Sequence, residues 1–203
     1  MILRLALLLS LAAAGTARAD NAAVASIQSQ LAPFGALQGH FHQSKTIRVL
    51  SRPLVSSGDF VLVKDKGLVW RTTSPLTTGV RITPQGIAQL KDGKATVLVS
   101  AKDQPGMSAV GKVLFAVFSL DLQRLQQHFA IRSASAPVGK PWTATLTPTD
   151  PGVAKFVKSI SLQGEKTVTS LELTEANGDV TAIHFSDVVL SRAPTAEEQA
   201  LLE

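Results

Sequence analysis

The chain has 203 residues, of which 20 are Lys or Arg, 15 are Asp or Glu and none is Cys, so its formal net charge is +5. This length fits one domain. The absence of Cys excludes disulfides, thiolate metal sites and the cysteine on which bacterial lipid attachment depends. The basic residues are scattered rather than massed in one stretch, so we expect no nucleic-acid partner.

Residues 1–19 have the pattern of a secretory signal peptide. Arg4 supplies the positive start, residues 5–14 form an uncharged apolar run, and Ala17-Arg18-Ala19 is a cleavage signal. The run is shorter than the about 20 residues that a membrane-spanning helix needs. Cleavage after Ala19 removes two bases and no acid, leaving 184 residues with a net charge of +3. The sequence therefore predicts an exported protein with one mature domain, residues 20–203. Export places the protein in a compartment without a nucleotide supply, which argues against ATP-driven activity.

The mature chain begins with a predicted amphipathic helix and continues as strands. Residues 21–37 carry apolar side chains at helical spacings of three and four, and Pro33 ends or bends the helix. From Gly39 the period changes to two, which is typical of strands. Short turns join successive strands, which therefore pair antiparallel. The strands are predicted at residues 39–49, 59–64, 68–72, 78–83, 86–91 and 96–101.

A helical pair is predicted to interrupt the strands at residues 107–129, with a turn at residues 119–121. Asp121 or Ser119 caps its second helix. Asn177-Gly178 predicts a hairpin turn late in the chain, and the pattern Thr-x-x-Glu from Thr195 predicts a capped C-terminal helix. Alternation of apolar and polar residues returns at residues 142–147, 157–163, 168–174 and 180–190.

These elements predict an α+β, mainly β fold, namely an incomplete antiparallel β-barrel, or strongly curved sheet, of about ten strands. An N-terminal helix precedes it and the helical pair covers its concave face. Residues 110–120 leave almost no polar face between Lys112 and Ser119, so they are buried nearly all round or lie over a cavity that admits something apolar. A helix that plugs its own core is the commoner case.

Short patterns that could carry chemistry are incomplete. Residues 106–113 nearly match a phosphate-binding loop, but Val113 stands where a Ser or Thr would hold Mg²⁺. His40 and His42 share one strand face, yet two histidines without an acidic cluster do not make a metal site, and surface histidines are the default. Hydrolase motifs are missing. We therefore predict no catalytic residue, no metal and no cofactor.

Trp70 and Trp142 each lie in an alternating strand. Core packing is the favoured interpretation for both, with a ligand-contacting wall as the alternative. Lys64, Lys66 and Arg71 crowd one hairpin, where such residues more often form a solvated rim than a site.

Several motifs over residues 20–100 occur in the order and spacing of a known family. They are Phe41-His-Gln43, Gly58-Asp59-Phe60, Leu68-Val-Trp70 and Ser74-Pro75. Together with the signal peptide and the first helix, they resemble the LolA family of periplasmic lipoprotein carriers. Divergent relatives are associated with lipid or aryl-polyene pigment clusters. Beyond residue 100 only the architecture agrees.

The resemblance implies a monomeric, non-enzymatic periplasmic carrier. Family members receive lipoproteins from an inner-membrane ATP-binding-cassette exporter, shield their acyl chains and pass them to an outer-membrane receptor lipoprotein. The arginine that holds the family's lid closed falls on Lys64 here. Because Lys lacks the planar fork of Arg, we expect lid control by Lys64 to be looser, or Arg71 to take this role instead.

The predicted site is an apolar cavity between sheet and lid. The strand face of Phe60 and Trp70 is the favoured wall, because the opposite face carries Asp59, Val69 and Arg71 and suits solvent better. The predicted cavity residues are Phe41, Phe60, Leu62, Leu68, Trp70, Met107, Leu114, Phe115 and Phe118.

Two other functions stay open on the sequence. The chain could be a periplasmic structural or interaction domain whose helical insert completes the core, or a metal-dependent periplasmic enzyme that uses His40 and His42.

Overall fold

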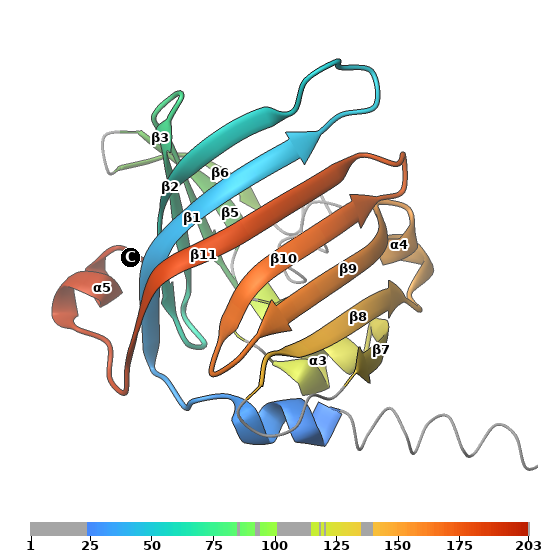
Figure 1. Cartoon of the computed structure of the whole chain (residues 1–203). Coiled ribbons are helices and arrows are strands. Elements are labelled where there is room, and N and C mark those ends of the chain that lie inside the picture. Colours follow the sequence, from blue (N-terminus) through green and yellow to red (C-terminus); the bar gives the residue numbers. More distant parts are fainter. Residues whose placement is uncertain are drawn as a thin grey trace, which may run out of the picture.

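The structure is a computed structural model of the whole chain (Figure 1). It describes residues 24–84, 86–91, 94–100, 115–117, 119, 121–134 and 140–202, with the backbone alone for 91, 94–100, 133 and 134. The predicted signal peptide and the near match to a phosphate-binding loop lie outside these residues. In the described part of the chain, no helix is both long enough and apolar enough to cross a bilayer.

The described strands form one antiparallel sheet of eleven strands, in the order β6-β5-β4-β3-β2-β1-β11-β10-β9-β8-β7. Most neighbours are consecutive in the chain, as short turns dictate, and the long β1–β11 pairing joins the two halves. The strands are β1 (Ala36–Thr46), β2 (Leu54–Val63), β3 (Gly67–Ser74), β4 (Thr78–Thr83), β5 (Gly86–Lys91), β6 (Lys94–Ser100), β7 (Phe129–Ala134), β8 (Trp142–Pro148), β9 (Val157–Gly164), β10 (Val168–Glu175) and β11 (Val180–Ser191).

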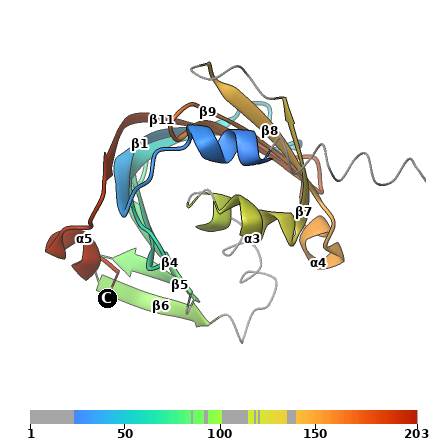
Figure 2. The ribbon, with the colours of Figure 1, turned by 90° about the horizontal axis from the view of Figure 1, so that it is seen from below.

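The sheet curls strongly without closing into a barrel, and β6 and β7 are its two edges (Figure 2). This confirms the predicted fold class. Figure 2 shows α3 (Leu122–Gln126) inside the curve and α5 (Ala196–Ala200) outside it, whereas α4 (Pro151–Ala154) lies at the end of β8 and β9 and its Val153 is buried in the main core. A helix at residues 24–30 lies at one end of the sheet, as Figure 1 shows, and its Val24 and Ile27 are buried in the main core.

Side chains alternate between the two faces of the sheet along each strand, and those that point to the concave face form the main core. In β8, Trp142, Ala144 and Leu146 are buried while the residues between them are exposed. Trp142 is fully buried and its indole N–H donates to the backbone oxygen of Glu165 at 2.7 Å, so the core interpretation of this residue is confirmed. The inward rows of both halves of the sheet form one continuous apolar cluster.

A second, smaller core lies on the convex face and was not predicted. Ala36, Val61 and Val63 are buried there, with Leu201 and Leu202 from the end of α5 packed against them. The prediction that this face suits solvent was therefore wrong at the Val63 end of β2, and Val69, the cross-strand partner of Val61 in β3, is buried as well. It was wrong because the C-terminal helix, which is distant in sequence, covers that end.

The predicted helical stretch 107–129 is corrected at its end. Residues 115–117 and α3 are helical, and Asp121 caps α3 by accepting from the backbone N–H of Arg124 at 2.9 Å, as predicted. Phe129, however, begins β7 and pairs with Pro148 of β8. Its apolar side chain fits the spacing of a helix and also the alternation of a short strand, and pairing with β8 decides between them.

The chain-end and hairpin predictions are confirmed. Thr195 accepts from the N–H of Glu198 at 3.2 Å, and the Glu198 carboxylate accepts from the N–H of Thr195 at 2.7 Å, a reciprocal capping box. Gly178 turns between β10 and β11 with a φ of 90°, a conformation that glycine adopts without strain.

Candidate functional site

The concave face carries a group of four aromatic side chains from β1, β2, β3 and β11. Phe41 and Trp70 stack with ring centroids 3.8 Å apart and planes inclined by 24°. Phe60 lies 6.0 Å from Trp70 and 5.4 Å from Phe185, which meets it edge to face. Such contacts add about 0.5–1.5 kcal/mol per pair beyond the area that the rings bury. We call Phe41, Phe60, Trp70 and Phe185 the aromatic group.

Gly58 is central to this arrangement. It is the cross-strand partner of Phe41 in β2, and a Cβ at this position would overlap the backbone of Arg71 and Thr72 in β3. The register of β2 and β3 shifts between Ser57 and Gly58 at the same place. A residue without a side chain therefore permits the close approach of β3, and the Phe41 and Trp70 rings meet across β2.

The structure brings together all of the predicted cavity residues that it describes. Phe41, Phe60, Leu62, Leu68 and Phe115 are buried in one apolar cluster, and Trp70 is half-buried against it. Phe115 comes from the inserted helical segment, so that segment contributes to the cluster on the concave face. The predicted cavity residues Met107, Leu114 and Phe118 lie outside the described residues.

Part of the apolar surface of this face remains accessible. The half-buried residues of the strands packed against the cluster are Trp70, Val80, Ile87, Leu173, Phe185, Val188 and Leu190. Removing such surface from water is favourable by about 25 cal/mol per Å², without any directional requirement on the ligand. The chemistry of this face is therefore that of binding an apolar group.

The two residues predicted to control the lid lie away from the aromatic group. The Lys64 side chain is exposed in the β2–β3 turn, and its backbone N–H donates to the oxygen of Gly35 at 2.9 Å. Arg71 alternates with Trp70 along β3 and so lies on the opposite face. There its Nε lies 2.6 Å from Oδ1 of Asp59, the cross-strand neighbour. Their role in lid control stays a prediction.

Two of the four histidines, His42 of β1 and His184 of β11, are exposed cross-strand partners. His40 and His42 are exposed on β1, on the face opposite Phe41. Nδ1 of His128 lies 3.5 Å from Oδ2 of Asp150, which caps α4 by accepting from the N–H groups of Gly152 and Val153. These two hydrogen bonds lower the pKa of Asp150, and His128 lowers it further. Within the described residues, no three His, Asp or Glu side chains are grouped as a metal site would need.

The sequence interpretation missed Phe185 as a site residue. In β11 it stands two residues after the buried Ile183, so the period of two already placed it on the same inner face. Which inward residue of β11 meets Trp70 depends on the register of β1 against β11, where Phe41 pairs with Phe185. A register shift between Gln38 and His40 makes that pairing hard to deduce from residue counts.

An open, curved antiparallel sheet with a continuous apolar concave face defines a fold suited to binding apolar ligands. The chain belongs to the family described as outer membrane lipoprotein carrier protein LolA-like, whose model matches residues 13–201. The predicted family resemblance is thereby confirmed. The comparison with curated protein sequences finds no match.

Solved structures with similar folds share little sequence with this chain. The LolA superfamily protein NE2245 from Nitrosomonas europaea is 11% identical with a TM-score of 0.47, covering 87% of this chain and 95% of that one. The lipoprotein LppX from Mycobacterium tuberculosis is 10% identical with a TM-score of 0.43, covering 87% and 98%. The match to the MucA/MucB complex from Pseudomonas aeruginosa is 14% identical in sequence with a TM-score of 0.45, and it covers 62% of that chain.

Proposed function

We propose that this protein is an exported, non-enzymatic carrier that shields acyl chains on its concave face while they cross the periplasm. The cargo class is an acylated lipoprotein or a related lipid. In this proposal residues 1–19 are the cleaved signal peptide, and the mature chain is a monomer between the inner and outer membranes.

The observation that carries the proposal is the aromatic group on the concave face. Phe41 and Phe60 are buried there, whereas Trp70 and Phe185 are half-buried and retain accessible ring surface. A ring stack at 3.8 Å is a rigid, flat apolar wall, against which methylene groups pack without needing a fixed register. Such a wall suits cargo that differs in polar part and shares an acyl chain.

The energetics of acyl binding favour a cover that competes with cargo. Each enclosed CH₂ contributes about 0.8 kcal/mol, so one long chain fully enclosed in a preformed cavity would hardly dissociate. Phe115 and Val117 of the helical segment are themselves buried. We propose that cargo displaces this segment, and that the lost contacts offset part of the binding free energy, which keeps the cargo transferable.

The finer assignments follow from this mechanism. Met107, Leu114 and Phe118 would complete the cover, and Lys64 or Arg71 would hold it closed. The partners would be an inner-membrane ATP-binding-cassette exporter that delivers cargo and an outer-membrane receptor lipoprotein that accepts it. No catalytic step, metal or cofactor is needed, because transfer between apolar environments breaks no covalent bond.

Native mass spectrometry of protein purified gently from the periplasm of its own host tests the proposal. A mass above that of the mature chain identifies the cargo, and its size separates a lipoprotein from a free lipid. A mass equal to the bare chain, together with no binding of an environment-sensitive apolar dye, contradicts the carrier function.

One alternative is favoured by a specific observation. Phe115, Ala116 and Val117 are all buried, as expected if the helical segment only completes the core. The protein would then be a structural or interaction domain. Native-state dye binding separates the two functions, because a self-plugged core offers no apolar surface to the dye.

A further inference from the structure

Exposed apolar side chains gather at one end of the sheet. Of the seven exposed large hydrophobic side chains among the described residues, only Val189 lies at the other end, near where β11 ends. The remaining six belong to the β1–β2 turn and the start of β2, the β3–β4 turn, and the segment between α4 and β9. They are Val49, Leu50, Leu54, Val55, Leu76 and Phe156.

The register of the sheet makes the β1–β2 hairpin the protruding part of this end. β11 begins at Val180 opposite Thr46, and β3 ends at Ser74 opposite Ser57. Residues 47–56 therefore extend past both neighbouring strands, and Figure 1 shows this hairpin reaching beyond the rest of the sheet. Val49, the most exposed of the six, is 89% accessible. We call residues 47–55 the hairpin tip.

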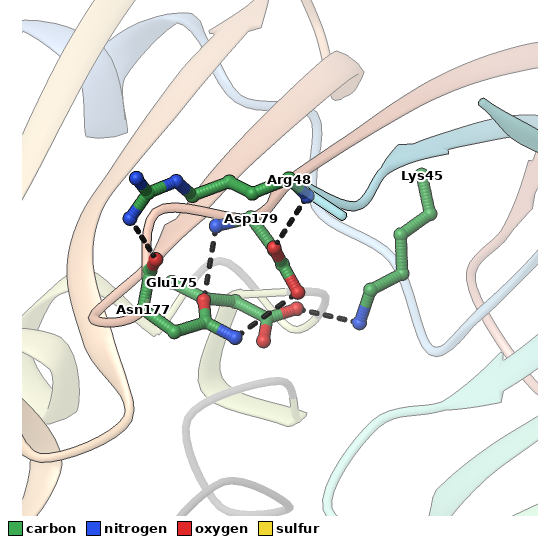
Figure 3. Close-up of polar contacts among 5 residues, drawn as sticks. All are labelled: Lys45, Arg48, Glu175, Asn177 and Asp179. Carbon is green, nitrogen blue, oxygen red and sulfur yellow. Dashed lines mark hydrogen bonds and ion pairs between the residues drawn. The ribbon is translucent and has the colours of Figure 1, made fainter. Parts of the chain in front are cut away.

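Polar contacts brace the hairpin against the β10–β11 turn (Figure 3). Nζ of Lys45 lies 2.7 Å from Oε1 of Glu175, and the backbone N–H of Arg48 donates to Oδ1 of Asp179 at 3.0 Å. Nη1 of Arg48 donates to the backbone oxygen of Asn177 at 3.2 Å. Asn177 and Asp179 also bond each other, at 2.9 and 3.0 Å. The hairpin tip is thus held in place by its base, although its apolar residues are exposed.

The charged side chains of the hairpin tip are all positive. Arg48 and Arg52 are exposed beside the apolar residues, and the sequence contains no Asp or Glu between residues 21 and 58. Acids on neighbouring elements accept bonds within the fold: Glu175 from Lys45, Asp179 from the backbone of Arg48, and Asp150 from the first turn of α4. Beside Phe156, the exposed Lys155 adds another positive charge at this end.

We propose that the hairpin tip docks onto the surface of an anionic phospholipid bilayer. Apolar side chains that enter the interface, flanked by Arg or Lys that meet lipid phosphates, are the two signals that together give reversible membrane attachment. Each basic residue near an anionic surface strengthens binding by a factor of about five. Charge complementarity favours this occupant over a second copy of the chain, whose identical tip would carry the same positive charges. The attachment would bring the concave face to the membrane without a spanning segment.

Flotation of the purified mature protein with lipid vesicles tests the proposal. The vesicles contain phosphatidylcholine alone or with about 30% phosphatidylglycerol, at salt concentrations from about 0.05 to about 0.5 M. We expect binding to the anionic vesicles, weakened by salt. The double variant Val49→Ser/Leu50→Ser should bind about tenfold or more weakly. Arg48→Gln/Arg52→Gln should lose about twentyfold on anionic vesicles, while the Arg48 backbone contact with Asp179 is retained.

Val189→Ser is the matched control, because it removes an exposed apolar side chain at the opposite end. It should float like the wild type. Unchanged thermal unfolding shows that each variant folds, and unchanged dye binding separates loss of docking from loss of the proposed carrier function. The proposal is overturned if the wild type does not bind anionic vesicles, or if the tip variants bind as the wild type does. It is also overturned if the tip variants abolish self-association in light scattering instead of vesicle binding.

Discussion

Phe41 and Trp70 stack across an intervening strand, with their ring centroids 3.8 Å apart. Phe41 lies in β1 and Trp70 in β3, and between them β2 presents Gly58. Phe41, Gly58 and Trp70, which belong to three of the motifs that pointed to the family, therefore lie side by side. Asp59, the residue after Gly58, pairs with Arg71, the residue after Trp70, on the opposite face.

Gly58→Ala should destabilise the fold, because the added methyl group would overlap the backbone of β3. Overpacking of this kind costs about 1–3 kcal/mol in the free energy of unfolding. Urea denaturation followed by circular dichroism measures it. Ser57→Ala, one residue earlier and half-buried, should unfold near the wild-type midpoint. Equal midpoints for Gly58→Ala and the wild type would mean that β3 does not approach β2 this closely.

The two tryptophans should separate stability from binding. Trp142→Ala removes a fully buried side chain and its bond to the oxygen of Glu165, so we expect a loss of about 3–5 kcal/mol in stability. Trp70→Ala removes a half-buried wall of the concave face and should mainly weaken the binding of an apolar dye. Titration of the dye against each variant measures this. Undiminished dye affinity in Trp70→Ala would contradict the proposed wall.

Phe115→Asp should abolish cargo and dye binding while the sheet stays folded. Phe115 packs in the same apolar cluster as Leu62 and Leu68, and a carboxylate there puts a charge against an apolar wall. Gln123→Asp, on an exposed position of α3, is the control. Cargo recovery from the periplasm, with circular dichroism as the check on folding, measures the effect. If Phe115→Asp recovers as much cargo as the wild type, the segment does not cover the binding face. Phe118→Asp tests the same lid and should also lose cargo.

Thr195→Ala should loosen the C-terminal helix and expose the convex-face core. It removes one half of the capping box with Glu198, which costs about 1 kcal/mol. Amide hydrogen exchange should then rise in α5 and around Val61 and Val63. Thr195→Ser keeps the hydroxyl and should protect α5 as the wild type does. Equal exchange in the Ala variant would show that Leu201 and Leu202 hold the helix without its cap.

Asp150 should make the stability of α4 depend on pH. The N–H groups of Val153 and Gly152 hold the pKa of this carboxyl below its ordinary value in the folded state. The stabilisation is therefore complete above the unfolded-state pKa of about 4 and is lost as the pH falls through the lower folded-state pKa. Asp150→Asn should unfold more easily than the wild type at neutral pH, with the difference shrinking below about pH 4. A difference that is constant from neutral to acidic pH would contradict this origin.

Several strand limits, helix caps and turns of this fold were predictable because they depend on local sequence. The limits of β4 and β5, the Asp121 and Thr195 caps and the Asn177-Gly178 turn agree with the expectations from the sequence. Each depends on residues a few positions apart, whose hydrogen bonds or backbone preferences do not need the rest of the chain. The inner face of Phe60 and Trp70 was likewise predictable from a period of two.

The sequence by itself determined an apolar face, its period and a family. Tertiary structure alone decided which residues meet on that face. Phe185 joins Trp70 because β11 pairs with β1 across about 140 residues of chain, with a register shift that residue counts do not reveal. Phe129 lies in a strand because it pairs with β8. Val61 and Val63 are buried because the C-terminal helix packs against β2. Local patterns fix which way a side chain points, whereas pairing and coverage depend on segments that only the folded chain brings together.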